Sequence, residues 1–145
     1  MIPDLEPFAL IDLVPLELRE VVLNITWDNE ALYALSLPVE HIIVADQRWQ
    51  LDLPWWRDGE KLFAVTPNQV RIEPRRYAAQ WQRTLAADLR YPIHVVENGE
   101  RLTILDGVHR LLKADMSGAE HIPARRLKMD DLVRIAHRRT TSSHS

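Results

Sequence analysis

The sequence predicts an α/β fold of the α+β kind, in which a small mixed sheet packs against helices. Two short apolar runs, residues 93–96 and 102–105, flank Asn98-Gly99, and this pattern is typical of a β-hairpin with a tight turn. A helix-like stretch follows directly at residues 108–116, and a further strand-like run covers residues 122–127. Strands and helices that alternate in this way pack as layers around one core.

The length of the chain, 145 residues, suits one compact domain with an appended lobe. We divide the sequence into three parts. Residues 1–65 form an N-terminal extension with a predicted hairpin, residues 66–137 form the main domain, and residues 138–145 form a disordered tail.

The composition excludes several classes of protein. No cysteine is present, so the sequence offers no disulfide, no thiolate metal site and no thiol nucleophile. Acidic residues interrupt the apolar positions of the first 30 residues, so neither a secretory signal nor a transmembrane segment is predicted there. We therefore expect a cytoplasmic protein without a membrane role.

Charge is unevenly distributed along the chain. Residues 1–60 carry 3 basic and 12 acidic side chains, whereas residues 61–145 carry 15 basic and 9 acidic ones. The basic half is expected either to meet phosphate or DNA, or to be a solvated surface that attracts the acidic half. A basic face for DNA would consist of Arg75, Arg76, Arg83, Arg90, Arg125, Arg126 and Lys128.

The N-terminal extension has two predicted elements. Asp28 is expected to cap a short helix that runs to Leu35. Residues 40–53 are predicted as a strand that turns at Asp58-Gly59 and returns along residues 61–65. The neighbouring tryptophans are expected to lie mostly in the core, with an exposed patch as the alternative; they are Trp27, Trp49, Trp55 and Trp56.

The main domain begins with two predicted helices. Thr66-Pro67 is typical of a helix cap followed by proline in the first turn. A longer helix is predicted to start at Pro74 and to end before Pro92. Its apolar stripe has a spacing of four residues and consists of Tyr77, Trp81, Leu85 and Leu89.

The remaining elements follow the hairpin. The helix at residues 108–116 is expected to end at Ser117-Gly118, because glycine is favoured just after a helix. After the strand at residues 122–127, Asp130 or Asp131 is expected to cap a last helix over residues 132–137.

The junction between the second hairpin strand and the following helix is the strongest candidate for a functional site. It reads Asp106-Gly107-Val108-His109-Arg110. A strand that turns at glycine into a helix directs unpaired backbone N–H groups and the positive end of the helix dipole toward one point. Such a point binds anions, and Arg110 adds a charged hydrogen-bonding group. We therefore expect phosphate contacts from Gly107, Val108, His109 and Arg110.

Residues 70–128 resemble the ParB and sulfiredoxin superfamily. The resemblance consists of an upstream helix, a strand that begins Pro92-Ile93, the Asp106–Arg110 junction, a helix with small residues, and a strand preceded by Gly118. It implies a ParB/sulfiredoxin-like fold and a site for nucleotide phosphates at Gly107, His109 and Arg110. Sulfiredoxin activity is excluded, because the cysteine of those enzymes is replaced by Val108.

Other branches of the superfamily differ in what they imply. ParB partition proteins carry a DNA-binding domain after this region, whereas this chain has almost nothing after residue 137. The small free-serine kinase branch has an Asp-Gly-x-His-Arg form, which this sequence resembles more closely. That branch also uses a catalytic glutamate, for which Glu73 is the candidate here.

These observations predict a ParB-like domain that binds nucleotide phosphates, with ATP, ADP or CTP as ligand. It would act as a small-molecule kinase or an NTPase, with Glu73, Asp106 and His109 as catalytic residues and Mg²⁺ held partly by Asp106. The alternative is a non-catalytic module that binds a nucleotide, DNA or a protein. In a purely structural interpretation, Asp106 caps the helix and His109 packs in the core. A nuclease is disfavoured, because the sequence shows no compact cluster of carboxylates and histidines.

Overall fold

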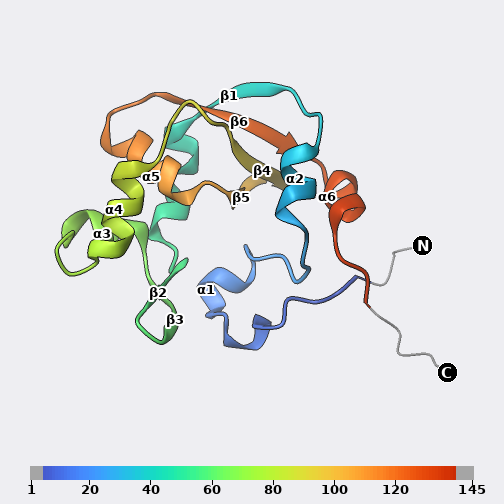
Figure 1. Ribbon diagram of the computed structural model, residues 1–145, viewed down its shortest axis with the longest axis horizontal. Coiled ribbons are helices and arrows are strands. Elements are labelled where there is room, and N and C mark those ends of the chain that lie inside the picture. The colour runs from blue at the N-terminus through green and yellow to red at the C-terminus, as the bar shows by residue number, and fades with distance from the viewer. Residues whose placement is uncertain (1–4, 140–145) are drawn as a thin grey trace.

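A computed structural model describes residues 5–139 and contains a mixed four-stranded sheet (Figure 1). The strands lie in the order β1-β6-β4-β5, with bounds β1 Val39–Ile43, β4 Ile93–Asn98, β5 Arg101–Asp106 and β6 His121–Leu127. The two central strands, β4 and β6, are parallel, and each outer strand is antiparallel to its neighbour. The predicted mixed sheet with packed helices is therefore confirmed.

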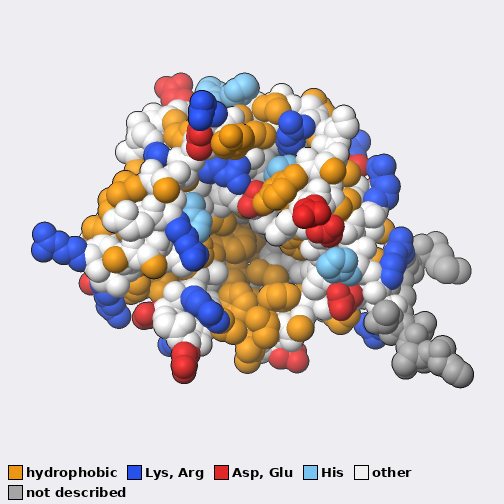
Figure 2. Space-filling view, in the orientation of Figure 1, with side chains coloured by type: hydrophobic (Ala, Val, Ile, Leu, Met, Phe, Trp, Pro, Cys, Tyr) orange, Lys and Arg blue, Asp and Glu red, His pale blue; other side chains and the backbone are white. Residues whose placement is uncertain are grey.

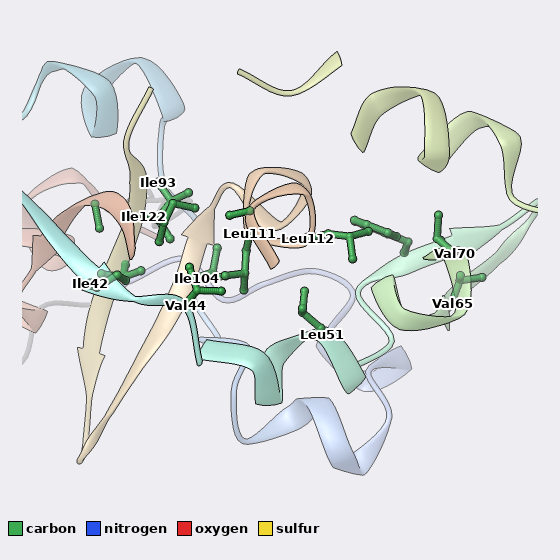
Figure 3. Close-up of a cluster of buried hydrophobic side chains, with 14 of the residues drawn as sticks. Ile42, Val44, Leu51, Val65, Val70, Ile93, Ile104, Leu111, Leu112 and Ile122 are labelled. Atoms are coloured by element: carbon green, nitrogen blue, oxygen red, sulfur yellow. The ribbon is translucent and has the colours of Figure 1, made fainter. Parts of the chain in front are cut away.

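The main core lies between the sheet and a layer of helices. That layer consists of η2 (Val44–Asp52), α3 (Pro67–Ile72), α4 (Ala78–Ala86) and α5 (Val108–Met116). Figure 3 shows Leu111 and Leu112 of α5 between the isoleucines of the sheet and the side chains of η2 and α3. Burial of this apolar face fixes α5, and therefore the junction before it, against the sheet.

The opposite face of the sheet is covered by α2 (Asn29–Ala34) and α6 (Met129–Ile135). Their core contains four fully buried residues, Leu32, Val96, Leu127 and Leu132. A third cluster forms where η1 (Ile11–Leu13) and α1 (Leu16–Arg19) pack near the short hairpin.

The predicted first hairpin is wrong in its first strand. Only residues 39–43 are extended, and this strand, β1, pairs with β6 instead of with residues 61–65. Residues 44–52 form the 3₁₀ helix η2, whose buried positions Val44, Gln47 and Gln50 repeat every three residues. The hairpin itself is shorter and lies between β2 (Trp56–Asp58) and β3 (Lys61–Val65).

The predicted helix caps at Asp28, Thr66 and Gly118 are confirmed. The Asp28 carboxylate accepts a hydrogen bond from the Glu30 N–H at the start of α2. Thr66 and Gln69 form a reciprocal capping box on α3. Gly118 has a positive φ of 76° just after α5, as expected for a C-terminal cap.

The helix predicted from Pro74 starts later than expected. The helix α4 begins at Ala78, after a turn at residues 74–77. Three residues of the predicted apolar stripe, Tyr77, Trp81 and Leu89, pack in or against the main core. The fourth, Leu85, is 47% exposed, and the adjacent Thr84 is fully buried. The Thr84 hydroxyl is satisfied by donating to the Gln80 carbonyl, which makes its burial acceptable.

Smaller corrections concern the ends of elements. The hairpin loop is Gly99-Glu100, one residue later than predicted, because Asn98 pairs with Arg101. The last helix starts at Met129 with Lys128 as its N-cap, so the predicted cap at Asp130 or Asp131 is wrong, and the helix ends at Ile135. Arg138 forms a bridge with Leu5, whereas residues 140–145 of the predicted tail lie outside the described residues. Trp56 is buried, and the other three tryptophans named above are half-buried.

The sheet takes strands from both sides of the boundary that the sequence suggested at residue 65. Strand β1 precedes this boundary, and β4, β5 and β6 follow it. Among residues 5–139, no helix has the length and apolar character that crossing a membrane requires.

Candidate functional site

Three adjacent strands place Asp106, His94 and Arg125 in one row. His94 on β4 is the register partner of Asp106 on β5 and of Arg125 on β6. All three side chains line one cavity on the α2 side of the sheet. The row therefore brings an acid, an imidazole and a guanidinium together at the end of the sheet where β4 begins and β5 ends.

A β-bulge directs Asp106 into this row. Val95 pairs with Ile104 and His94 pairs with Asp106, so Leu105 is an extra residue on β5. Ile104 packs in the main core, whereas Leu105 packs in the core on the α2 side. Strict alternation would return Asp106 to the face of Ile104, and the extra residue turns it to the opposite face, beside His94.

Arg110 reaches the same cavity from the first turn of α5. Its Nη2 donates to Asp106 Oδ2 at 2.8 Å, and its Nη1 donates to the carbonyl oxygen of Pro92 at 2.6 Å. A longer bond joins Nη1 to the Tyr91 carbonyl at 3.3 Å. These hydrogen bonds fix the guanidinium. Arg110 therefore links the loop before β4 to the end of β5.

The loop before β4 is also held by Lys113. Its Nζ donates to the carbonyl oxygens of Leu85 and Ala87, at 2.7 and 2.6 Å. A cation at these last carbonyls of α4 complements the helix dipole. This contact joins α5 to the end of α4, where the loop that forms one wall of the cavity begins.

The cavity has a volume of about 480 Å³. We call it the polar cavity. Its lining comes from α2, from the loop before β4, from three strands and from α5, and consists of Tyr33, Asp88, Tyr91, Pro92, His94, Asp106, Arg110 and Arg125. This volume lies within the range of small-molecule sites, and several charged groups converge on it.

The charges in the polar cavity leave one cation unbalanced. Asp106 is paired with Arg110, and Asp88 is paired with Arg90 at 2.7 Å. The Arg90 hydrogen bond lowers the pKa of Asp88 to about 2, so this carboxylate stays ionised. Within residues 5–139, Arg125 has no carboxylate within 4.0 Å, and its Nη1 donates to the Leu37 carbonyl oxygen. The cavity is therefore suited to an anion beside Arg125.

His94 is 5% exposed, and neither of its ring nitrogens has a hydrogen-bond partner within the described residues. Burial lowers the pKa of His94, and the nearby Asp106 carboxylate opposes this only in part. The ring is therefore neutral at pH 7. Tyr33 packs beside it, with 5.6 Å between the ring centres. Burial, followed by the Asp106 charge, raises the pKa of Tyr33, so its hydroxyl stays protonated.

Comparisons with protein-family models, with curated proteins and with solved structures give no match to this chain. The resemblance to the ParB and sulfiredoxin superfamily therefore stays a prediction.

The structure places the predicted site residues in two different surroundings. Asp106 and Arg110 line the polar cavity, whereas His109 does not. The His109 ring stacks on Trp56, with 4.4 Å between ring centres, and its Nε2 lies 2.7 Å from the Gln80 side-chain oxygen. Burial, followed by the charges of Arg83 and Arg110, lowers the pKa of His109 to about 4.

Gly107 and Val108 also lie outside the lining of the polar cavity. Gly107 has a φ of 119°, and a Cβ built there would lie 2.4 Å from Ile93 Cγ2. Its glycine is required by the turn and by the close approach of Ile93. Val108 packs against the main core.

Glu73 is exposed and lies outside the lining of the polar cavity. It ends α3 and pairs with Arg76 at 3.6 Å. Within the described part of the chain, no group of three His, Asp or Glu side chains is arranged to hold a metal ion. Asp106, the single metal ligand that the sequence predicted, lines the polar cavity and is already paired with Arg110.

Several arginines of the predicted basic face are paired. Arg126 contacts Glu40 at 2.6 Å and Glu97 at 3.8 Å. As described above, Arg76 and Arg90 also have carboxylate partners. The contact with Glu40 joins the acidic N-terminal half to the basic half.

Sequence reasoning missed His94 and Tyr33 and assigned Arg125 to a surface. One signal for His94 was present, because a histidine in an otherwise apolar strand segment, Ile93–Val96, is a polar group in the core. Nothing local marks Tyr33 or Arg125, because their closeness to Asp106 depends on the order of the strands.

Proposed function

We propose that the chain binds the phosphate group of a small organic ligand in the polar cavity. The observation that carries this proposal is that the guanidinium of Arg125, which has no carboxylate partner among the described residues, lies beside the buried, neutral ring of His94. A charged group in a partly enclosed site is stabilised by a counter-ion, and phosphate supplies charge and several acceptor oxygens.

The remaining donors of the cavity support the same ligand chemistry. Arg125 offers a planar guanidinium, which suits the oxygens of a phosphate. Tyr33 keeps its hydroxyl proton, and a neutral His94 carries one ring N–H. Arg110 adds positive charge, but its guanidinium is held by Asp106, so it mainly shapes the wall of the site.

A nucleotide is the ligand that the sequence resemblance implies, and ATP, ADP and CTP remain the first compounds to test. In this proposal Mg²⁺ would bind mainly to the ligand's phosphate oxygens, with Asp106 as the candidate protein ligand. A kinase or NTPase reaction remains a proposal that turnover under saturating nucleotide would test. The non-catalytic binding module is the simpler form, because Glu73 and His109 lie outside the cavity.

The test is titration calorimetry with inorganic phosphate, ATP, ADP and CTP, each with and without Mg²⁺. In Arg125→Gln we expect affinity for the phosphate compound that binds to fall at least tenfold, as is typical for loss of a charged hydrogen bond. Arg126→Gln is the matched control, because it removes the same charge from the neighbouring position of β6 outside the cavity. Unchanged affinity in Arg125→Gln, or no binding of any phosphate compound by the native chain, would overturn the proposal.

A further inference from the structure

A second cavity lies next to the polar one. Its volume is about 350 Å³, and we call it the apolar cavity. Figure 2 shows a hollow in the middle of this face that is lined mostly by hydrophobic side chains. Its lining comes from the N-terminal segment, the start of α2, the residue before β2, β3 and β5. It consists of Phe8, Val21, Val22, Leu23, Ile25, Thr26, Trp27, Asn29, Trp55, Phe63, Thr103, Ile104 and Leu105.

The two cavities share two structural elements. On β5, Leu105 lines the apolar cavity and the next residue, Asp106, lines the polar one. On α2, Asn29 lines the apolar cavity and Tyr33 lines the polar one. These helix residues are four positions apart, so they lie on one face of α2, about 6 Å apart along its axis.

The bulge at Leu105 makes this arrangement possible. It turns Leu105 and Asp106 to the same side of the sheet, where consecutive residues of a regular strand would point to opposite sides. A charged lining residue of one cavity and an apolar lining residue of the other are therefore adjacent on one side of β5.

The lining of the apolar cavity favours a hydrocarbon over a nucleobase. Among its lining residues, Thr26, Asn29 and Thr103 alone carry polar side-chain atoms besides the indole N–H groups of Trp27 and Trp55. The Trp55 indole already donates to the Gln50 carbonyl at 2.6 Å. A nucleobase carries several hydrogen-bonding groups that lose their water on binding, and the lining of the apolar cavity offers few partners to replace it. An aliphatic chain needs only apolar contact.

We infer that the two cavities together bind an anionic amphiphile, namely a phosphate monoester of an aliphatic alcohol. The phosphate lies at Arg125 in the polar cavity, and the chain extends past Leu105 into the apolar cavity. This inference depends on the proposed function, because it names the organic part of the ligand whose phosphate that function assigns. The ligand is a single dissolved molecule, since both cavities are formed by one chain and their volumes are those of small-molecule sites.

The test compares butyl, hexyl and octyl phosphate with inorganic phosphate and with 1-octanol, all below the concentrations at which micelles form. Each methylene that becomes buried should raise affinity about fourfold until the cavity is full. We therefore expect octyl phosphate to bind at least tenfold more tightly than butyl phosphate, and octanol to bind more weakly than octyl phosphate.

Variants in each cavity distinguish the contributions of the two cavities to binding. Val22→Phe and Leu23→Phe place bulk in the apolar cavity and should abolish the gain with chain length, while binding of inorganic phosphate stays unchanged. Leu16→Phe makes the same kind of change at a residue that is 78% exposed and outside both linings, so it is the control. Arg125→Gln should lower the affinity for every phosphate ester by the same factor.

Each other outcome has a defined meaning. Octyl phosphate that binds no better than butyl phosphate, or a chain-length gain that persists in both phenylalanine variants, would overturn the inference. If inorganic phosphate still binds through Arg125 in that case, the proposed function stands alone. Binding only to vesicles that contain phosphatidic acid, or tighter binding of a nucleotide than of octyl phosphate, would also overturn the inference. Octanol binding without any phosphate binding would overturn both.

Discussion

His94 and Asp106 lie opposite each other on β4 and β5, and the distance between His94 Nδ1 and Asp106 Oδ2 is 3.9 Å. This is longer than a hydrogen bond, so the carboxylate influences the ring mainly through its charge. The Asp106 carboxylate instead accepts a hydrogen bond from Arg110. The charge of Asp106 is thus paired with Arg110 and lies beside the His94 imidazole, away from Arg125.

Asp106→Asn is expected to raise the affinity for inorganic phosphate severalfold when no divalent metal is present. The change removes a negative charge from the wall of the cavity and keeps the shape of the side chain. Titration calorimetry measures the effect, with Asp131→Asn as the control on α6, where the carboxylate pairs with Arg134 outside the cavity. Weaker binding would show instead that Asp106 acts by holding Arg110 in place. A loss confined to solutions with Mg²⁺ would assign Asp106 to the metal.

Stability is expected to fall as the pH decreases from about 6.5 toward 4. The pKa of His109 is lowered to about 4 from an ordinary value of 6.5, and the pKa of His94 is lowered as well. The unfolded chain therefore takes up these protons first, so the stabilisation present above pH 6.5 is lost as the pH falls. For His109 alone the loss is about 2 kcal/mol, after allowance for its partial exposure to solvent.

Urea unfolding between pH 7 and pH 4 measures this effect. His109→Phe keeps a ring to stack on Trp56 but cannot be protonated, so its stability should change less with pH than that of the native chain. His41→Phe, at an exposed position on β1, is the control and should keep the native pH dependence. Parallel curves for the native chain and His109→Phe would contradict the assignment.

Gly107→Ala is expected to destabilise the fold by about 2 kcal/mol or more. The new Cβ would lie 2.4 Å from Ile93 Cγ2, and the φ of 119° is strained for any residue with a side chain. Thermal unfolding measures the loss. Gly99→Ala has a positive φ of 65° but no atom within 4 Å of its Cβ, so it separates backbone strain from the clash. Equal losses in the two variants would mean that contact with Ile93 is unimportant.

Asp115→Asn is expected to destabilise the chain by about 2–3 kcal/mol. The carboxylate accepts from Arg48 Nε at 2.7 Å and from Arg71 Nη2 at 2.6 Å, and its side chain is 8% exposed. Burial raises the pKa of Asp115, but the hydrogen bonds and charges of the two arginines outweigh it and hold the pKa below its usual value. The amide would leave the half-buried Arg71 without its counter-ion. Denaturant unfolding at pH 7 measures the effect, and Asp130→Asn, at an exposed position on α6, should be nearly neutral.

The parts of the fold that the sequence predicted well are decided locally. Asp28, Thr66 and Gly118 act within one turn of the helix ends that they mark, so each can be recognised without the rest of the structure. The 3₁₀ helix η2 could not be predicted in this way, because it is stabilised by distant partners. Gln50 hydrogen-bonds to Leu102 and Ile104 on β5, more than 50 residues away.

The residues of the candidate site also differ in whether local sequence or long-range pairing brings them together. Asp106 and Arg110 belong to one short junction, so grouping them in one candidate site required no knowledge of the strand order. The position of His94 and Arg125 beside them requires β4 to lie between β5 and β6, and the orientation of Asp106 requires a bulge. No short-range pattern in the residues of β5 predicts that bulge.

The pairing of β1 with β6 also has a consequence for synthesis on the ribosome. Residues 39–43 emerge early, but they pair with residues 121–125, which emerge about 80 residues later. The β4–β5 hairpin and α5 involve nearby residues and can form first. Until β6 has left the exit tunnel, β1 has no neighbour in the sheet, and both of its edges stay open to pairing with other chains.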